Sequence, residues 1–189
     1  MIWYDLEIVK MIPTKGQDNN PELSYCKGWG DHSNMGISVL VAFSEERKTV
    51  GVFMNDNRAE FQEWIDETNF IMGFNNHRFD DKVVLTNWHV NIPQEKSIDL
   101  YPIIRDQAPK GIRGSLSLGA LCEANFNIGK LGDGAQYPAL WQKGHRGEVI
   151  NDCINDVRML KLLYSKIKKV GKIIDPRTGN EMVIKMGNG

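Results

Sequence analysis

The stretch Met1-Ile-Trp-Tyr-Asp-Leu-Glu-Ile-Val9 is apolar or aromatic throughout, apart from Asp5 and Glu7. A continuous apolar run of this length is typical of a central strand that is buried on both faces. Successive side chains of a strand point to opposite faces, so Asp5 and Glu7 share one face. An unpaired negative charge is costly in such apolar surroundings. The stretch therefore predicts a buried strand that carries two ligands of a divalent-metal site.

Composition and charge limit the possible functions. The 189 residues fit one compact domain, because no linker rich in Pro, Gly or Ser divides the chain into comparable halves. With 23 Lys and Arg against 24 Asp and Glu, no global basic field drives tight non-specific duplex binding. Any contact to nucleic acid is therefore local.

The cysteines and the apolar runs indicate a cellular setting. Cys26, Cys122 and Cys153 are widely spaced and form no CxxC pair, which argues against a disulfide framework and a zinc ribbon. The apolar runs are short, and no basic segment with a long apolar stretch opens the chain. We expect a cytoplasmic protein without a membrane segment or targeting signal.

The apolar pattern further along the chain predicts an α/β fold with a mixed sheet. A long polar loop covers 13–33, and a Gly-rich irregular region covers 109–147. The remaining elements are predicted as strands at 35–43, 49–54, 70–74 and 97–104, helices at 58–67, 80–88, 116–123 and 148–168, and a hairpin around 173–184. This order indicates a mixed sheet with helices on its faces. We expect 1–168 to form one domain, with 169–189 as a hairpin or tail of the same unit.

The last predicted helix carries an acid on its apolar side. At about 100° per residue, Asp156 projects inside an arc of apolar side chains. That arc consists of Val149, Cys153, Val157, Leu160, Leu163 and Ile167. No Lys or Arg interrupts it, and the other acids, Asp5, Glu7 and Asp80, would repel Asp156. Bound Mg²⁺ or Mn²⁺ resolves the conflict, because these ions prefer carboxylate oxygens. Asp152, one turn earlier at the edge of the arc, is predicted to line the same cavity from a wetter position.

Three acidic segments follow one another in a recognisable order. Asp5-Leu-Glu7 lies on the first strand, Gly73-Phe-Asn-Asn-His-Arg-Phe-Asp-Asp81 crosses a strand-to-helix turn, and Asp152-Cys-Ile-Asn-Asp-Val157 lies on the last helix. In order and spacing they resemble the three motifs of the DEDD (DnaQ-like) 3′–5′ exonuclease superfamily, over roughly 2–168. The second segment closely resembles the corresponding part of bacterial exonuclease I.

The resemblance implies a metal-dependent 3′–5′ exonuclease with a ribonuclease H-like fold, a mixed five-stranded sheet flanked by helices. In such an enzyme Asp5, Glu7, Asp80 and Asp156 hold two Mg²⁺ or Mn²⁺ ions. The implied partner is the 3′ end of single-stranded DNA or RNA, and the products are nucleoside 5′-monophosphates.

The resemblance also implies substrate contacts next to the acids. Leu6 and Phe79 would wedge against the terminal base, with core packing as the alternative for Phe79. Asn75 and Asn76 would contact the terminal nucleotide, with turn formation as the alternative. Asp81 is interpreted as a helix-start charge favoured by the helix dipole.

The third segment departs from the family pattern. The family carries a Tyr four residues or a His five residues before the final Asp, where this chain has Asp152 and Asn151. Asp152 therefore stays open as a water-orienting base, a fifth metal ligand or a solvated helix residue. His145 is either a group that reaches in from the preceding loop or an exposed loop residue.

Further residues have both a functional and a structural interpretation. Trp29, Trp88 and Trp141 offer stacking platforms for bases, with a loop anchor as the alternative for Trp141, and Asp99 is interpreted as a strand-end cap. Basic residues near the second motif and the later loops are either phosphate contacts or surface charges. They are Arg78, Lys110, Arg113, Lys130, Lys143 and Arg146.

Two other functions remain open. One is a structure-selective nuclease, and the other is a nucleic-acid-binding module whose catalysis has weakened, as the departure at Asp152 suggests. The sequence does not determine protein partners or the oligomeric state.

Overall fold

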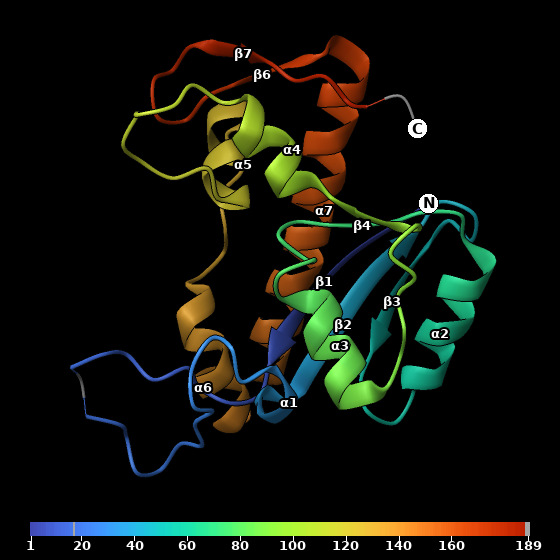
Figure 1. The fold of residues 1–189 in the computed structure, drawn as a ribbon. Coiled ribbons are helices and arrows are strands. Elements are labelled where there is room, and N and C mark those ends of the chain that lie inside the picture. The colour runs from blue at the N-terminus through green and yellow to red at the C-terminus, as the bar shows by residue number, and fades with distance from the viewer. Residues whose placement is uncertain (17, 188–189) are drawn as a thin grey trace.

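A computed structural model describes residues 1–16 and 18–187. A mixed five-stranded sheet with the order β3-β2-β1-β4-β5 forms its centre (Figure 1). Its strands are β1 Ile2–Ile8, β2 Ile37–Ser44, β3 Thr49–Phe53, β4 Ile71–Gly73 and β5 Ser97–Asp99. Strand β1 pairs antiparallel with β2 and parallel with β4, so the acidic first strand occupies the middle of the sheet. This confirms the predicted α/β, ribonuclease H-like fold.

Helices cover both faces of the sheet, and a two-stranded hairpin follows the last helix. The helices are α1 His32–Met35, α2 Arg58–Glu67, α3 Asp80–Trp88, α4 Leu100–Gln107, α5 Leu118–Phe126, the 3-10 helix η1 Gly134–Gln136, α6 Tyr137–Gln142 and α7 Arg146–Val170. The hairpin consists of β6 Lys172–Ile174 and β7 Glu181–Val183, as predicted. Among the described residues, no helix is both long and apolar enough to cross a membrane.

Strand β1 separates two hydrophobic cores. Ile2, Tyr4 and Leu6 pack with residues of α2 and α3 on one face. Trp3 packs on the other face with residues of α4, α5 and α7. The two sets of helices lie on opposite sides of the sheet in Figure 1. Because side chains alternate along a strand, Asp5 and Glu7 share the face of Trp3, which is the face that α7 covers.

The bounds of several elements agree with the sequence pattern, and one element differs. Helices α2 and α3 have the predicted bounds. The predicted strand over 97–104 is wrong beyond Asp99, because helix α4 begins at Leu100. The Asp99 carboxylate accepts a hydrogen bond from the backbone N–H of Tyr101 at 3.0 Å and so caps this helix. Pro102 lies in the first turn, where its missing N–H costs nothing.

The late region also holds more structure than the sequence predicted. Helix α7 extends the predicted 148–168 at both ends and stops at Gly171, which adopts a left-handed conformation with φ of 68°. The Gly-rich region 109–147 contains η1 and α6 in addition to a helix near its middle. Helix α6 lies beside β1 and α7 and takes part in the candidate site.

Candidate metal centre

Three carboxylates from two elements meet on the α7 face of the sheet. Asp5 and Glu7 come from β1, and Asp156 comes from α7. Each offers one oxygen, and these oxygens lie within 4.8 Å of one another. In the described part of the chain, no other group of acids, histidines or cysteines meets this criterion. Strand alternation and the helical arc therefore predicted the position of this acidic group.

The electrostatics of the acidic group favour a bound cation. Burial raises the pKa of Asp5 well above its usual range, and the neighbouring Asp156 and Asp80 carboxylates raise it further. Burial also raises the pKa of Glu7. The free energy cost of ionising these acids falls when a divalent ion lies between them, and an all-oxygen donor set suits Mg²⁺ or Mn²⁺. The residues present therefore fit a metal ion.

Lys130 supplies a counter-ion that the sequence analysis missed. Its Nζ lies 2.6 Å from Asp156 Oδ2, although no Lys or Arg occurs on the apolar side of α7 itself. The Lys arrives from the loop Gly129-Lys-Leu-Gly-Asp-Gly134. Asp156 Oδ1 has no hydrogen-bond partner within the described residues. One ammonium cannot balance three carboxylates, so Lys130 relieves the repulsion only in part.

Asp80 lies near the acidic group but is not one of its three members. It is the first residue of α3, and its exposed fraction is 7%. Burial raises its pKa to about 7, while backbone N–H groups of Asp80 itself and Leu6 favour the charged form. Its influence on the pKa of Asp5 indicates proximity. Whether Asp80 is a fourth metal ligand remains a prediction.

Asp152 is buried, which contradicts both the wetter position and the solvated helix residue considered for it. Its exposed fraction is 2%. Its Oδ1 accepts a hydrogen bond from the backbone N–H of Leu131 at 3.0 Å, and its Oδ2 has no partner among the residues described. Tyr137 of α6 lies next to it: burial raises the pKa of the Tyr137 phenol, and a side-chain hydrogen bond with Asp152 and the charge of that carboxylate raise it further.

His145 lies away from the acids. It occupies the residue before α7, and its side chain is 53% exposed. Its Nδ1 is 3.0 Å from a carboxylate oxygen of Glu148, which is also exposed. This position agrees with the exposed loop residue that was one of its two interpretations.

The second motif divides into a structural part and a surface part. Asn76 is fully buried and donates hydrogen bonds to the Asp81 carboxylate at 3.2 Å and to Ser97 Oγ at 3.0 Å. Asp81 also accepts a hydrogen bond from the Tyr4 hydroxyl. Asp81 therefore lies in the first turn of α3, as predicted for a helix-start charge, and it is also the centre of a half-buried hydrogen-bond network. Asn75, in contrast, lines a pocket beside the acidic group.

Asp99 holds the backbone of that motif. Its carboxylate accepts hydrogen bonds from the N–H groups of Asn75 at 2.7 Å and His77 at 3.3 Å, in addition to Tyr101. Asn75 adopts a left-handed conformation with φ of 67°. The predicted capping role of Asp99 is confirmed, and it extends to the turn before α3.

Two pockets meet at the acidic group. The first, of about 500 Å³, adjoins Glu7 and is largely apolar. Its apolar side chains include Leu6, Met11, Ile12, Trp29, Phe79 and Pro138. The second, of about 830 Å³, adjoins Asp5 and Asp156 and is more polar. Its polar side chains include Asn75, Arg78, Ser115, Ser117 and Lys130.

Trp29 lines both pockets. Its side chain is 71% exposed and stands edge to face against Phe79, with the ring centroids 5.8 Å apart. The polar loop 13–33 thus delivers an aromatic ring to the acidic group, which apolar periodicity could not predict.

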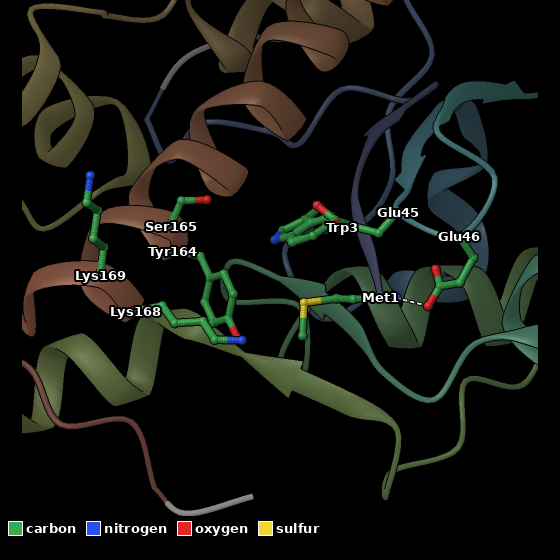
Figure 2. A pocket seen from close by; sticks show the side chains of 8 residues that line it. All are labelled: Met1, Trp3, Glu45, Glu46, Tyr164, Ser165, Lys168 and Lys169. Atoms are coloured by element: carbon green, nitrogen blue, oxygen red, sulfur yellow. Dashed lines mark hydrogen bonds and ion pairs between the residues drawn. The ribbon is translucent and has the colours of Figure 1, made fainter.

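A further pocket lies at the other end of β1, away from the acids. It has a volume of about 590 Å³. Figure 2 shows Tyr164, Lys168 and Lys169 of α7 on one side and Met1, Trp3, Glu45 and Glu46 on the other. It contains neither the acidic group nor its neighbours, and we assign it no role.

The fold and the acidic group together define an α/β protein with a ribonuclease H-like sheet and a candidate metal site. No protein-family model matches the chain, and no curated protein matches it. A structure of the family B DNA polymerase from the hyperthermophilic archaeon Pyrobaculum calidifontis is similar, with a TM-score of 0.63 at 15% sequence identity. The match covers 88% of this chain and 24% of the polymerase chain. This chain thus spans about a quarter of the polymerase, and at this identity the similarity shows the fold alone.

Proposed function

We propose that this chain is a metal-dependent 3′–5′ exonuclease that hydrolyses single-stranded DNA or RNA ends to nucleoside 5′-monophosphates. The observation that supports it best is the position of the Asp5, Glu7 and Asp156 oxygens, within 4.8 Å of one another where the two pockets meet. A chain end bound across both pockets would place its last phosphodiester bond beside these acids. The similarity of the fold to that of a DNA polymerase agrees with a nucleic-acid substrate.

The two pockets suggest how a strand end would lie. The terminal base fits the apolar pocket, where Phe79 and Trp29 offer aromatic surfaces for stacking. The preceding nucleotides fit the polar pocket, where Arg78 and Lys130 face the phosphates. Trp29 would separate the last two bases, so that a paired end would have to open before it entered.

The acids would hold the ions for the reaction. Asp5, Glu7 and Asp156 would bind one metal ion, and Asp80 with Asp5 would contribute to a second. Two such ions supply activation of water and stabilisation of the leaving 3′ oxygen. The chain itself would orient the phosphate through Arg78 and Lys130 and keep water away from the base through the apolar pocket.

The test is mononucleotide release from 5′-labelled and 3′-labelled single strands of DNA and RNA with Mn²⁺. Asp5→Asn should lower the rate at least a hundredfold, because it removes a charged ligand without changing the shape of the side chain. Asp106→Asn is the matched control, since Asp106 is exposed on α4 and, among the described residues, pairs only with Arg105. Unchanged activity in Asp5→Asn would overturn the proposal.

The same assay separates the competing functions. Cleavage products longer than one nucleotide from 3′-blocked strands would indicate a structure-selective nuclease. Mn²⁺ binding without turnover on any substrate would indicate a binding module with weakened catalysis, which the acid at position 152 makes a specific alternative.

A further inference from the structure

The pairing between β1 and β4 ends before the acids of the candidate metal site. Strand β4 pairs with β1 at Ile2 and Trp3, and Asp5 and Glu7 lie beyond these pairs. Asp80 belongs to the segment that follows β4. The ladder of the sheet therefore does not hold Asp80 next to Asp5, and other contacts have to fix its position.

A side-chain hydrogen bond joins β1 to α3 where this pairing ends. The Tyr4 hydroxyl donates it to Asp81 Oδ1. Tyr4 directly precedes Asp5 on β1, and Asp81 directly follows Asp80 in the first turn of α3. The bond therefore links the neighbours of two acids that come from different elements.

Two more donors hold the Asp81 carboxylate. Ser97 Oγ of β5 donates to its Oδ2 at 2.9 Å, and Asn76 Nδ2 donates to its Oδ1 at 3.2 Å. Gly73 leaves room for Asn76, because a Cβ at position 73 would lie 2.6 Å from the Asn76 Cβ. Tyr4 and Ser97 donate to different oxygens of Asp81. An asparagine, which has one side-chain oxygen, could not accept both bonds in this way.

A fixed Asp81 limits the direction of Asp80. Successive side chains of a helix point about 100° apart, so the orientation of one determines that of the next. The Asp80 carboxylate accepts a hydrogen bond from the backbone N–H of Leu6. Asp80 thus meets β1 at the residue that lies between Asp5 and Glu7.

Core packing alone does not explain the tyrosine on β1. Tyr4 is 1% exposed, and its ring lies against Phe61 with the centroids 6.1 Å apart. Phenylalanine would fill nearly the same volume, so the hydroxyl serves the hydrogen bond to Asp81. Hydrogen bonds around a metal site orient the ligands and raise the affinity for the metal.

We propose that Tyr4 and Asp81 are positioning residues that hold Asp80 beside Asp5, so that both carboxylates contact the same metal ion. The inference rests on the metal site of the proposed function. The Tyr4–Asp81 bond fixes the spacing between β1 and α3, and with it the spacing between the two ligands. Without this bond, binding of the ion has to order the first turn of α3, and its affinity falls.

The first test is a Mn²⁺ titration followed by the electron paramagnetic resonance signal of the free ion. The ion that Asp80 binds is identified as the one whose affinity falls in Asp80→Asn. Its affinity should fall about tenfold in Tyr4→Phe and in Asp81→Asn, as is typical when a group that orients a ligand is removed. Tyr4→Phe changes no charge of the carboxylates, so its effect reports position.

Three results of this titration would overturn the inference. One is an affinity for this ion within twofold of the wild type in Tyr4→Phe. Another is an equal loss for all bound ions in Asp81→Asn, which would indicate a general effect of charge. The third is an unchanged titration in Asp80→Asn, because Asp80 would then bind no ion.

Ser97→Ala is the matched control for a purely structural role. It removes another hydroxyl from the same carboxylate, but Ser97 lies on β5, which carries none of the candidate metal ligands. The melting temperature of the metal-free protein should fall by about 2–4 °C in Ser97→Ala and in Tyr4→Phe alike. Only Tyr4→Phe should lose Mn²⁺ affinity, and an equal loss in Ser97→Ala would overturn the inference.

Kinetics give a second readout. In Tyr4→Phe the Mn²⁺ concentration for half-maximal activity should rise about tenfold, while kcat at saturating Mn²⁺ stays within twofold of the wild type. Tyr164→Phe, in the remote pocket, should match the wild type in both values. A kcat of Tyr4→Phe that stays low at saturating Mn²⁺ would overturn the inference.

These outcomes separate the inference from the proposed function. A wild-type chain that releases no mononucleotides overturns the function, and the Mn²⁺ titration, which needs no turnover, still decides whether Tyr4 and Asp81 position Asp80. Melting temperatures verify that each variant folds. Asp81→Asn carries the test if Tyr4→Phe does not fold.

Discussion

Lys130 and Asp156 form a pair in which the partners differ in exposure, since the Asp156 side chain is buried and that of Lys130 is about one-third exposed. Removal of the ammonium in Lys130→Met leaves a buried carboxylate without its partner. We expect a loss of about 1–3 kcal/mol in the free energy of unfolding of the metal-free protein. Mn²⁺ should restore the lost stability, because a divalent ion compensates the charge of Asp156 and no longer has to compete with Lys130 for it.

Thermal melts with and without Mn²⁺ measure this effect. The stabilisation by Mn²⁺ should be larger in Lys130→Met than in the wild type, whereas Lys143→Met, an exposed loop lysine, should match the wild type. Equal stabilisation by Mn²⁺ in Lys130→Met and the wild type would show that Lys130 does not compete with the ion.

The buried acids predict an unusual pH dependence. An unfolded Asp loses its proton near pH 4, whereas the pKa of Asp80 in the folded protein is about 7. The folded state therefore binds more protons than the unfolded state between these values. Through Asp80 alone, the free energy of unfolding of the metal-free protein should fall by at most about 1.4 kcal/mol for each pH unit as the pH rises from about 4 to about 7.

Urea denaturation at several pH values, with a chelator present, measures this slope. Asp80→Asn should reduce it, and the remaining slope should come from Asp5 and Glu7, whose pKa values are also raised. Saturating Mg²⁺ should flatten the profile, since the bound ion favours the charged carboxylates. A stability that rises steadily over this pH range would contradict the prediction.

Helix α4 and the turn before α3 depend on one carboxylate. Asp99 accepts hydrogen bonds from three backbone N–H groups, those of Asn75, His77 and Tyr101. Asp99→Ala should lower the free energy of unfolding by about 1–2 kcal/mol, as expected for the loss of a helix cap. Urea denaturation provides the measurement, with Asp106→Ala at the exposed end of α4 as the control. A loss no larger than in Asp106→Ala would contradict the capping role.

The loop that carries Trp29 should determine how the substrate binds. Trp29→Ala should raise KM about tenfold with little change in kcat, because one base–aromatic stack contributes about 1–3 kcal/mol. Binding of a nucleoside monophosphate with Mn²⁺ should also quench tryptophan fluorescence. The quenching should disappear in Trp29→Phe and persist in Trp141→Phe. Quenching that persists without Trp29 would place the base elsewhere.

At the scale of elements, the helices and strands with a periodic apolar pattern were predicted well, and the irregular segments were not. Strand β1 and helices α2 and α3 follow from alternation and from helical spacing, since their side chains face a core. The segment after Asp99 was assigned to a strand because its apolar residues fit either structure, and only the hydrogen bonds of Asp99 distinguish the two. Residues of aperiodic loops, such as Trp29 and Lys130, occupy positions that no local pattern predicts.

At the scale of the whole molecule, a near-neutral charge restricts how nucleic acid can bind. The chain has 23 basic and 24 acidic side chains, and the polar pocket presents Arg78 and Lys130. With about two phosphate contacts, the logarithm of the binding constant for a short single strand should fall with the logarithm of salt concentration with a slope of roughly −1.4. Fluorescence anisotropy gives the binding constant at several salt concentrations between roughly 50 and 300 mM, and the slope of these constants tests this value. A slope steeper than about −4 would require a basic surface outside the pocket.

The overall fold and the acidic group were predicted more completely than the machinery around them. Asp5, Glu7 and Asp156 share a face because of strand and helix geometry, which the sequence contains. The neighbours of Asp152 come from α6 and from the loop of Lys130, so their approach depends on tertiary packing. The sequence therefore located the acids, and the structure was needed to find Lys130 beside Asp156.

The alternation of β1 has a consequence for how the gene can vary. A single-residue deletion or insertion between Asp5 and Glu7 would place the two acids on opposite faces of the strand. One of them would then point into the core of α2 and α3 and could not join Asp156. Libraries of random variants should accordingly contain functional substitutions of Leu6 and almost no functional length changes at that position.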